Sequence, residues 1–259
     1  MNVARRWGAR PGARSCLVGV LAAVLAAYAV PAAGASTIPT AALAAAVPAS
    51  PGSFAGQGFD ACTAPPSDVM AAWRRSSPYR AVGIYVGGVN RACTQPELTP
   101  TWVATQTAAG WRLVPIYMGL QPQCTTSNKT FRFTPATAAT AGRDAATDAV
   151  NRSKALGLPR GSTVFLDVEA YRTDDPTCRT SVLRYQSAWT ARMHDLGYLS
   201  GFYSSLSSGV ADQVAVYGST AWVRPDRASL PSTQSMSTTP TSNGWPPSDA
   251  TSCIAPVPT

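Results

Sequence analysis

Strand-like and helix-like segments alternate along this chain from residue 53 onward. The strand-like segments are short apolar stretches at residues 57–61, 80–86, 111–118, 164–169, 199–203 and 220–223. Between them lie segments with apolar residues at helical spacing, such as Val182, Gln186 and Trp189. Repeated strand–helix units of this length connect by right-handed crossovers and form a parallel sheet. The number of units favours an α/β fold of the TIM-type (β/α) barrel over an open doubly wound sheet.

Two of the predicted helices have recognisable beginnings. Thr99 and Pro100 supply an N-cap and a first-turn proline for a helix that carries Trp102. Thr134 and Pro135 do the same for an alanine-rich helix that extends to about residue 156. No glycine-rich phosphate-binding motif follows any of the predicted strands, so no nucleotide cofactor is expected.

The strand at residues 164–169 ends with two carboxylates, Asp167 and Glu169. Successive strand side chains point to opposite faces, so these two share one face, about 6.6 Å apart along the strand. Two like charges held this close do not ionise independently, and one group keeps its proton to a higher pH. A protonated acid beside a carboxylate is typical of a glycosidase. The alternative for a bare Asp-x-Glu is a strand that runs into an ordinary acidic loop.

Polar side chains also follow the other predicted strands. The carboxyl ends of the strands form the catalytic face of a TIM-type barrel, so these side chains are expected to converge there. We predict Glu169, Asp167 and Asp60 as catalytic residues. The predicted sugar-binding residues are Tyr85, Tyr117, Gln121, Tyr171, Tyr203 and Trp222. Taken alone, each has a structural alternative, such as a loop cap for Asp60 or a core position for Trp222.

Several separate motifs of the chain resemble one known family. They are residues 58–62 (GFDAC), 83–88 (GIYVGG), 115–121 (PIYMGLQ), 167–169 (DVE) and 197–204 (GYLSGFYS). In this order they are similar to the glycoside-hydrolase-like domain of secreted actinobacterial proteins, also called domain of unknown function 1906. That domain is a TIM-barrel relative of the family 25 muramidases, which cleave the glycan strand of peptidoglycan. The resemblance covers residues 54–224 and implies Glu169 as the acid, Asp167 as its partner and Asp60 as a further active-site carboxylate.

No motif of that family is recognised after Arg224, where the sequence becomes rich in Ser, Thr and Pro. We therefore expect a barrel domain at residues 53–224 that is incomplete at its C-terminal end, followed by a disordered tail at 225–259. An unclosed barrel exposes two sheet edges, which favours aggregation or pairing with another chain.

The first 35 residues have the pattern of a secretory signal peptide. Four arginines precede an apolar run at residues 17–30, and Ala33-Gly34-Ala35 matches a cleavage site before Ser36. The run is too short to remain as a membrane span, so we expect a secreted or cell-wall-associated protein without a stable span after signal removal. The general secretory and twin-arginine routes both stay open. Residues 36–52 are uncharged and rich in Ala, Pro, Ser and Thr, which predicts a flexible linker.

Removal of the signal peptide also lowers the formal net charge. Its four arginines leave 21 − 4 = 17 basic residues against 13 acidic ones, or +4. The sequence has no basic stripe interleaved with aromatic residues, so nucleic acid is a poor partner. The chain has a single histidine, His194, and its cysteine spacings do not match a zinc site, so no metal is expected.

Five cysteines remain after signal removal, and an exported chain forms disulfides. Five thiols cannot all pair, and two bridges can be arranged among them in several ways. Cys62 and Cys93 lie just beyond the first two predicted strands, and Cys124 and Cys178 lie beyond the next two. We therefore predict the pairs Cys62–Cys93 and Cys124–Cys178, with Cys253 left over.

Three hypotheses of function follow from these patterns. The first is a secreted hydrolase of muramidase type that acts on a cell-wall polysaccharide, peptidoglycan, with Glu169 protonating the leaving oxygen. The second is a catalytically inactive barrel that binds the same glycan. The third is a truncated remnant with no activity. A turnover assay separates the first from the second, and soluble expression with a cooperative melt separates both from the third.

Overall fold

The computed structural model describes residues 46–229 and the strand at 252–256. The predicted signal peptide and most of the predicted linker therefore lie outside the described residues. The main sheet consists of β1 (Gly56–Ala61), β2 (Ala81–Gly87), β3 (Arg112–Tyr117), β6 (Thr163–Asp167), β7 (Leu199–Tyr203), β8 (Arg227–Ser229) and β9 (Ser252–Pro256). A small second sheet pairs β4 (Gln121–Pro122) with β5 (Arg132–Phe133). The helices are α1 (Ser67–Ser76), α2 (Pro100–Ala108), α3 (Ala138–Ala155), α4 (Pro176–Asp195) and α5 (Gly209–Ala215).

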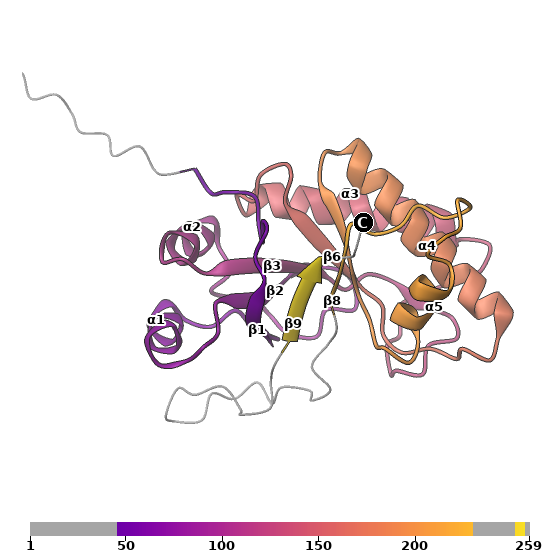
Figure 1. The fold of residues 1–259 in the computed structure, drawn as a ribbon, viewed down its shortest axis with the longest axis horizontal. Helices are drawn as coiled ribbons and strands as arrows, with labels where there is room; N and C mark the ends of the chain where they lie inside the picture. Colours follow the sequence, from indigo (N-terminus) through magenta and orange to yellow (C-terminus); the bar gives the residue numbers. More distant parts are fainter. Residues whose placement is uncertain (1–45, 230–251, 257–259) are drawn as a thin grey trace, which may run out of the picture. The chain divides into compact units, whose positions relative to one another are not determined.

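The chain is an α/β protein with a parallel sheet, as predicted. β1, β2, β3, β6 and β7 are hydrogen-bonded in this order and all parallel, and β8 adds a further parallel strand beside β7. β9 pairs antiparallel with both β8 and β1, and it lies between them in Figure 1. A TIM barrel, which has eight parallel strands, is not confirmed.

The prediction of a strand at residues 220–223 is wrong. Its backbone pairs with side chains of α4 instead of another strand: the Val223 N–H donates to Ser187 Oγ, and the Val223 carbonyl accepts from Gln186. The last parallel strand begins later, at Arg227. Both β8 and β9 thus lie within residues 225–259, for which the sequence predicts a disordered tail. Their pairing satisfies backbone groups at the edges of β1 and β7 that would otherwise be exposed.

The two faces of the parallel sheet have different neighbours. The outer face, which carries residues such as Phe59, Ile84 and Leu166, packs against the helices in one large apolar core. We call the opposite side the inner face; its buried residues are Ala81, Val114, Ile116, Phe165 and Tyr203. Figure 1 shows α1 and α2 side by side next to β1–β3, and α3, α4 and α5 grouped on the other side.

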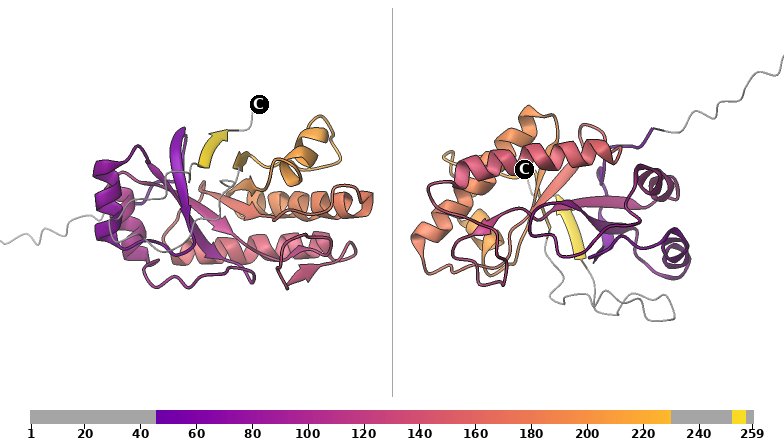
Figure 2. Two further views of the ribbon diagram at one scale, coloured as in Figure 1. Left: turned by 90° about the horizontal axis from the view of Figure 1, so that it is seen from below. Right: turned by 180° about the vertical axis from the view of Figure 1, so that it is seen from behind.

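Helices α3 and α4 lie side by side (Figure 2) because α3 presents a face of small residues. A Cβ atom added at Gly142 would lie 2.2 Å from the carbonyl oxygen of Tyr185 on α4, so only glycine allows this approach. Helix α2 begins as predicted, with Thr99 capping the Trp102 N–H. Helix α3 begins at Ala138, three residues beyond the predicted proline, because Thr134–Thr137 first form a hydrogen-bonded turn.

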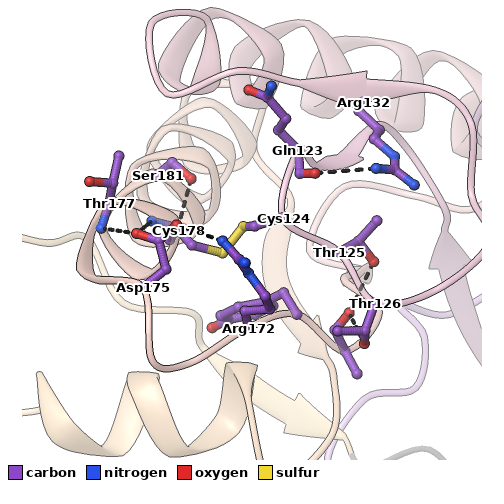
Figure 3. The surroundings of a disulfide bond; sticks show 12 residues. Gln123, Cys124, Thr125, Thr126, Arg132, Arg172, Asp175, Thr177, Cys178 and Ser181 are labelled. Atoms are coloured by element: carbon purple, nitrogen blue, oxygen red, sulfur yellow. Dashed lines mark hydrogen bonds and ion pairs between the residues drawn. A yellow bond between two sulfur atoms is a disulfide. The ribbon is translucent and has the colours of Figure 1, made fainter.

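Both predicted disulfides are confirmed. Cys62 joins Cys93 across 31 positions, and Cys124 joins Cys178 across 54 positions. Figure 3 shows the second bridge fastening the loop after β4 to the first turn of α4. The side chain of Cys253 lies outside the described residues.

Replacing Cys124 and Cys178 together by serine is expected to lower the free energy of unfolding by about 4 kcal/mol, the loop-entropy cost of a bridge of this span. Urea unfolding of the oxidised protein and the double variant measures the difference. The reduced wild type should unfold at lower urea than the double variant, because it has lost the Cys62–Cys93 bridge as well. An unchanged midpoint for the double variant would contradict this prediction.

Of the helices that the structure describes, none combines the length and apolarity needed to cross a membrane.

Candidate active site

Three carboxyl groups gather at the carboxyl end of the parallel sheet. Asp60 is the second-last residue of β1 and Asp167 is the last residue of β6, and both alternate with outer-face residues, so their side chains lie on the inner face. Glu169 follows two residues after Asp167. Gly83 is the partner of Asp60 on β2, and a Cβ atom there would lie 2.1 Å from Asp60 Oδ1. The glycine therefore provides the space that the Asp60 carboxyl group occupies.

Asp60 is held by Tyr203, the last residue of β7. The Tyr203 hydroxyl donates a 2.7 Å hydrogen bond to Asp60 Oδ2. Burial raises the pKa of Asp60 from 3.8 to about 6, and the hydrogen bond from Tyr203 opposes this change. Asp60 therefore changes its charge close to neutral pH.

Asp167 is the most buried of the three carboxyl groups, with 4% of its surface exposed. Burial raises its pKa well above the ordinary value, and the negative charges of Glu169 and Asp60 raise it further, whereas Lys129 lowers it. A raised pKa is the direction expected for one of two carboxyl groups placed two residues apart.

Glu169 is the accessible member of the pair. Its side chain is 36% exposed, and its Oε1 lies 3.9 Å from Nζ of Lys129. Lys129 lies in the loop between β4 and β5 and was not predicted as a site residue. It is one of two lysines in the chain, but no local pattern shows that its loop returns to Glu169.

Two of the predicted sugar-binding tyrosines join this group. Tyr203 contacts Asp60 directly. Tyr85 is on the inner face of β2, and its pKa is raised by burial and then by the charges of Asp167, Asp60 and Glu169. The structure thus brings together five predicted residues: Asp60, Tyr85, Asp167, Glu169 and Tyr203.

Tyr117 and Tyr171 lie elsewhere. Tyr117 is on the outer face of β3, where its hydroxyl donates to Asp148 of α3 at 2.8 Å. The hydroxyl of Tyr171 donates to the buried Asp212 of α5 at 2.7 Å, and Asp212 also accepts from Arg179. Both phenols are thus occupied by structural partners.

The two remaining predicted residues also differ from the expectation. Trp222 is half-buried, in the segment that pairs with α4 rather than at the end of a strand. Gln121 is fully buried, and both ends of its amide are hydrogen-bonded to the backbone of residues 167 and 169. In the described part of the chain, no group of three or more His, Cys, Asp or Glu side chains is placed to hold a metal.

The raised pKa of Asp60 predicts a pH-dependent gain in stability for Asp60→Asn. The native state binds this proton more tightly than the unfolded state, so the wild type loses stability as the pH rises from about 4 to above 6. A rise of the pKa from 3.8 to about 6 corresponds to about 3 kcal/mol of unfolding free energy that the wild type loses over this pH range. Asparagine does not titrate, so the variant does not lose it. Urea unfolding of both proteins at pH 4 and 7.5 measures this, and an advantage of Asp60→Asn that is equal at the two pH values would contradict it.

An inner face with paired carboxyl groups and tyrosines, at the carboxyl edge of a parallel sheet, defines a protein of glycosidase-like construction. The chain belongs to the family described as Rv2525c-like, glycoside hydrolase-like domain, whose model matches residues 71–253. The match extends past Arg224, where the sequence predicts the domain to end, and reaches into β9.

Two solved structures align with the chain. One is a crystal structure of an uncharacterized B. stearothermophilus protein, with 16% identity and a TM-score of 0.44 over 74% of this chain and 80% of that one. The other is the catalytic domain of endolysin ply40 from bacteriophage P40 of Listeria monocytogenes, with 9% identity and a TM-score of 0.40 over 78% of this chain and 93% of that one. Comparison with curated proteins gave no match.

Proposed function

We propose that this chain is an exported glycoside hydrolase that cleaves a cell-wall polysaccharide, with peptidoglycan as the substrate. The observation that carries the proposal is the carboxyl pair at the end of β6, in which a buried Asp167 with a raised pKa lies beside an accessible Glu169. Two carboxyl groups placed in this way can supply a proton donor and a negative charge, as glycoside hydrolysis requires. Membership of a glycoside hydrolase-like family supports the same reaction class.

In the proposed reaction, Glu169 in its protonated form gives its proton to the leaving glycosidic oxygen, because its carboxyl group is the one open to substrate. The bond between that oxygen and the sugar carbon breaks, and positive charge develops on the sugar. Asp167, left ionised on the same face, stabilises this charge. Water then adds its hydroxyl to the sugar carbon and returns a proton to the pair.

Asp60, Tyr203 and Tyr85 form the adjoining part of the site. With Tyr203 donating to it, Asp60 can accept a hydrogen bond from a sugar hydroxyl on its other carboxyl oxygen. The phenol of Tyr85 stays protonated because burial and then three carboxyl groups raise its pKa, and it can donate to the substrate. These groups position the sugar against the carboxyl pair.

A catalytically inactive glycan-binding protein is the second candidate, and the ion pair of Lys129 with Glu169 favours it. The ammonium group of Lys129 lies 3.9 Å from Oε1 and pairs with the carboxylate, and a carboxylate without its proton cannot act as the acid. The release of reducing sugar ends from purified peptidoglycan, measured together with co-sedimentation, separates the candidates. Hydrolysis supports the enzyme, whereas co-sedimentation without new reducing ends supports the binder.

We propose that the protein acts outside the cell, after removal of residues 1–35. Two disulfides are consistent with an oxidising compartment. N-terminal sequencing of protein recovered from the culture medium tests the proposal. The expected first residue is Ser36, and retention of the intact N-terminus inside the cell would refute it.

A further inference from the structure

The segment that carries Glu169 continues beyond the hydrogen-bonded part of β6. On one side it is still held by β7, because the Val168 N–H donates to the Tyr203 carbonyl and Ser204 Oγ donates to the Val168 carbonyl. On the other side β3 provides pairing only as far as Tyr117, which lies opposite Leu166. The Asp167 carbonyl and the Glu169 N–H therefore need a partner other than a strand.

Gln121 is that partner. Its Nε2 donates to the Asp167 carbonyl at 2.9 Å, and its Oε1 accepts from the Glu169 N–H at 2.8 Å. The side chain is fully buried. A primary amide is the side-chain group that offers a donor and an acceptor side by side, so it reproduces the two hydrogen bonds of a neighbouring strand.

The loop that follows Gln121 continues the same pairing. Thr125 Oγ1 and the Thr126 N–H both donate to the Ala170 carbonyl, each at 2.9 Å. The Arg172 N–H donates to the Cys124 carbonyl, and the Cys124 disulfide fixes this loop to α4 (Figure 3). Gln121 is thus anchored on a supported loop, which gives its amide a defined place relative to β6.

We propose that Gln121 is a positioning residue that sets the relative placement of the Asp167 and Glu169 carboxyl groups through their backbone, and that it does not touch the glycan. The inference rests on the proposed function for its catalytic consequence. The two hydrogen bonds of Gln121 hold the two peptide units on either side of Val168, which connect the two acidic residues. Their loss therefore frees the relative placement of the two carboxyl groups. A displacement of about 1 Å costs on the order of a hundredfold in rate.

The test compares Gln121→Met with Gln186→Met. Methionine keeps the length of the side chain and removes both hydrogen bonds. Gln186 is an equally buried glutamine on α4 that donates to Thr190 and Val223, so its variant loses buried amide bonds away from the carboxyl pair. For Gln121→Met we expect kcat on peptidoglycan to fall on the order of a hundredfold with KM within about twofold of wild type. Gln186→Met should retain the wild-type kcat.

A second measurement does not need turnover. Carbon-13 NMR of labelled carboxyl groups follows the titration of Asp167 and Glu169 in each folded protein. We expect Gln121→Met to move at least one of the two midpoints by about one pH unit, because each group senses the distance to the other. Gln186→Met should leave both midpoints in place. If Gln121→Met does not melt cooperatively, Gln121→Asn, whose amide is too short to reach both backbone groups, is titrated instead.

The two measurements separate the two proposals. A wild type without turnover refutes the proposed hydrolase, and the titration alone then decides the role of Gln121. Titration curves of folded Gln121→Met that coincide with those of wild type would overturn the positioning role. So would a kcat loss that Gln186→Met shows to the same extent.

Discussion

Glu169→Gln is expected to abolish glycan hydrolysis while glycan binding and the melting temperature stay close to those of wild type. Glutamine has nearly the same shape as glutamate and removes only the proton that the leaving oxygen needs. General acid catalysis contributes roughly 10²–10⁴-fold to rate, so a loss of that size is expected in kcat. The side chain is 36% exposed and its ion pair with Lys129 is long, so the cost in stability should be small.

Glu97 provides the matched control, because it is the chain's other glutamate and is exposed. Glu97→Gln should leave kcat, binding and melting temperature unchanged. Release of reducing ends from peptidoglycan gives kcat, and co-sedimentation gives binding. Turnover by Glu169→Gln at the wild-type rate would refute Glu169 as the acid, and a large loss of binding would assign it to substrate recognition instead.

Much of the fold could be predicted because strands and helices have different apolar periods. The predicted strand 199–203 coincides with β7, the one at 57–61 begins one residue after β1 does, and the one at 80–86 is displaced from β2 by one residue at each end. The prediction failed at residues 220–223, where the backbone N–H and carbonyl of Val223 bond to side chains of α4. A pairing of that kind depends on the tertiary structure and leaves no local pattern.

The residues of the candidate site were likewise predictable only in part. Asp167 and Glu169 could be placed together because residues two apart on a strand share a face. The face of Tyr117 could not be predicted, because both faces of β3 are apolar and the alternation that distinguishes inside from outside is missing. Strand-end position alone therefore assigned Tyr117 to the site, whereas its hydroxyl contacts Asp148 of α3.

Lys129 and Gln121 show a further limit of prediction from the sequence. Both belong to the segment between β3 and α3, and both reach residues 167–169 only because that segment folds back over the end of β6. The sequence indicated Gln121 as polar and near a strand end, which gave the right place but the wrong partner. Its hydrogen bonds to backbone groups could not be read from residue types.

Gly83→Ala is expected to cause a loss of activity on the order of a hundredfold, although the new methyl group adds no charge and touches no proposed catalytic proton. The added Cβ would lie 2.1 Å from Asp60 Oδ1 and 3.0 Å from Ile116 Cδ1. Ile116 is fully buried, so the Asp60 carboxyl group has to move, and its hydrogen bond with Tyr203 is strained or broken. Displacement by about 1 Å at a catalytic site costs about that factor in rate.

The same substitution should lower the free energy of unfolding by about 1–3 kcal/mol, the usual cost of overpacking a filled interior. Gly218→Ala is the control, because a Cβ atom there meets nothing within 4 Å, and it should leave both activity and stability unchanged. Urea unfolding and the reducing-end assay measure the two effects. If Gly83→Ala keeps wild-type kcat while losing stability, the inner face tolerates a displaced Asp60, and Asp60 has no part in placing the sugar. If it keeps both, the space beside Asp60 is not filled in solution.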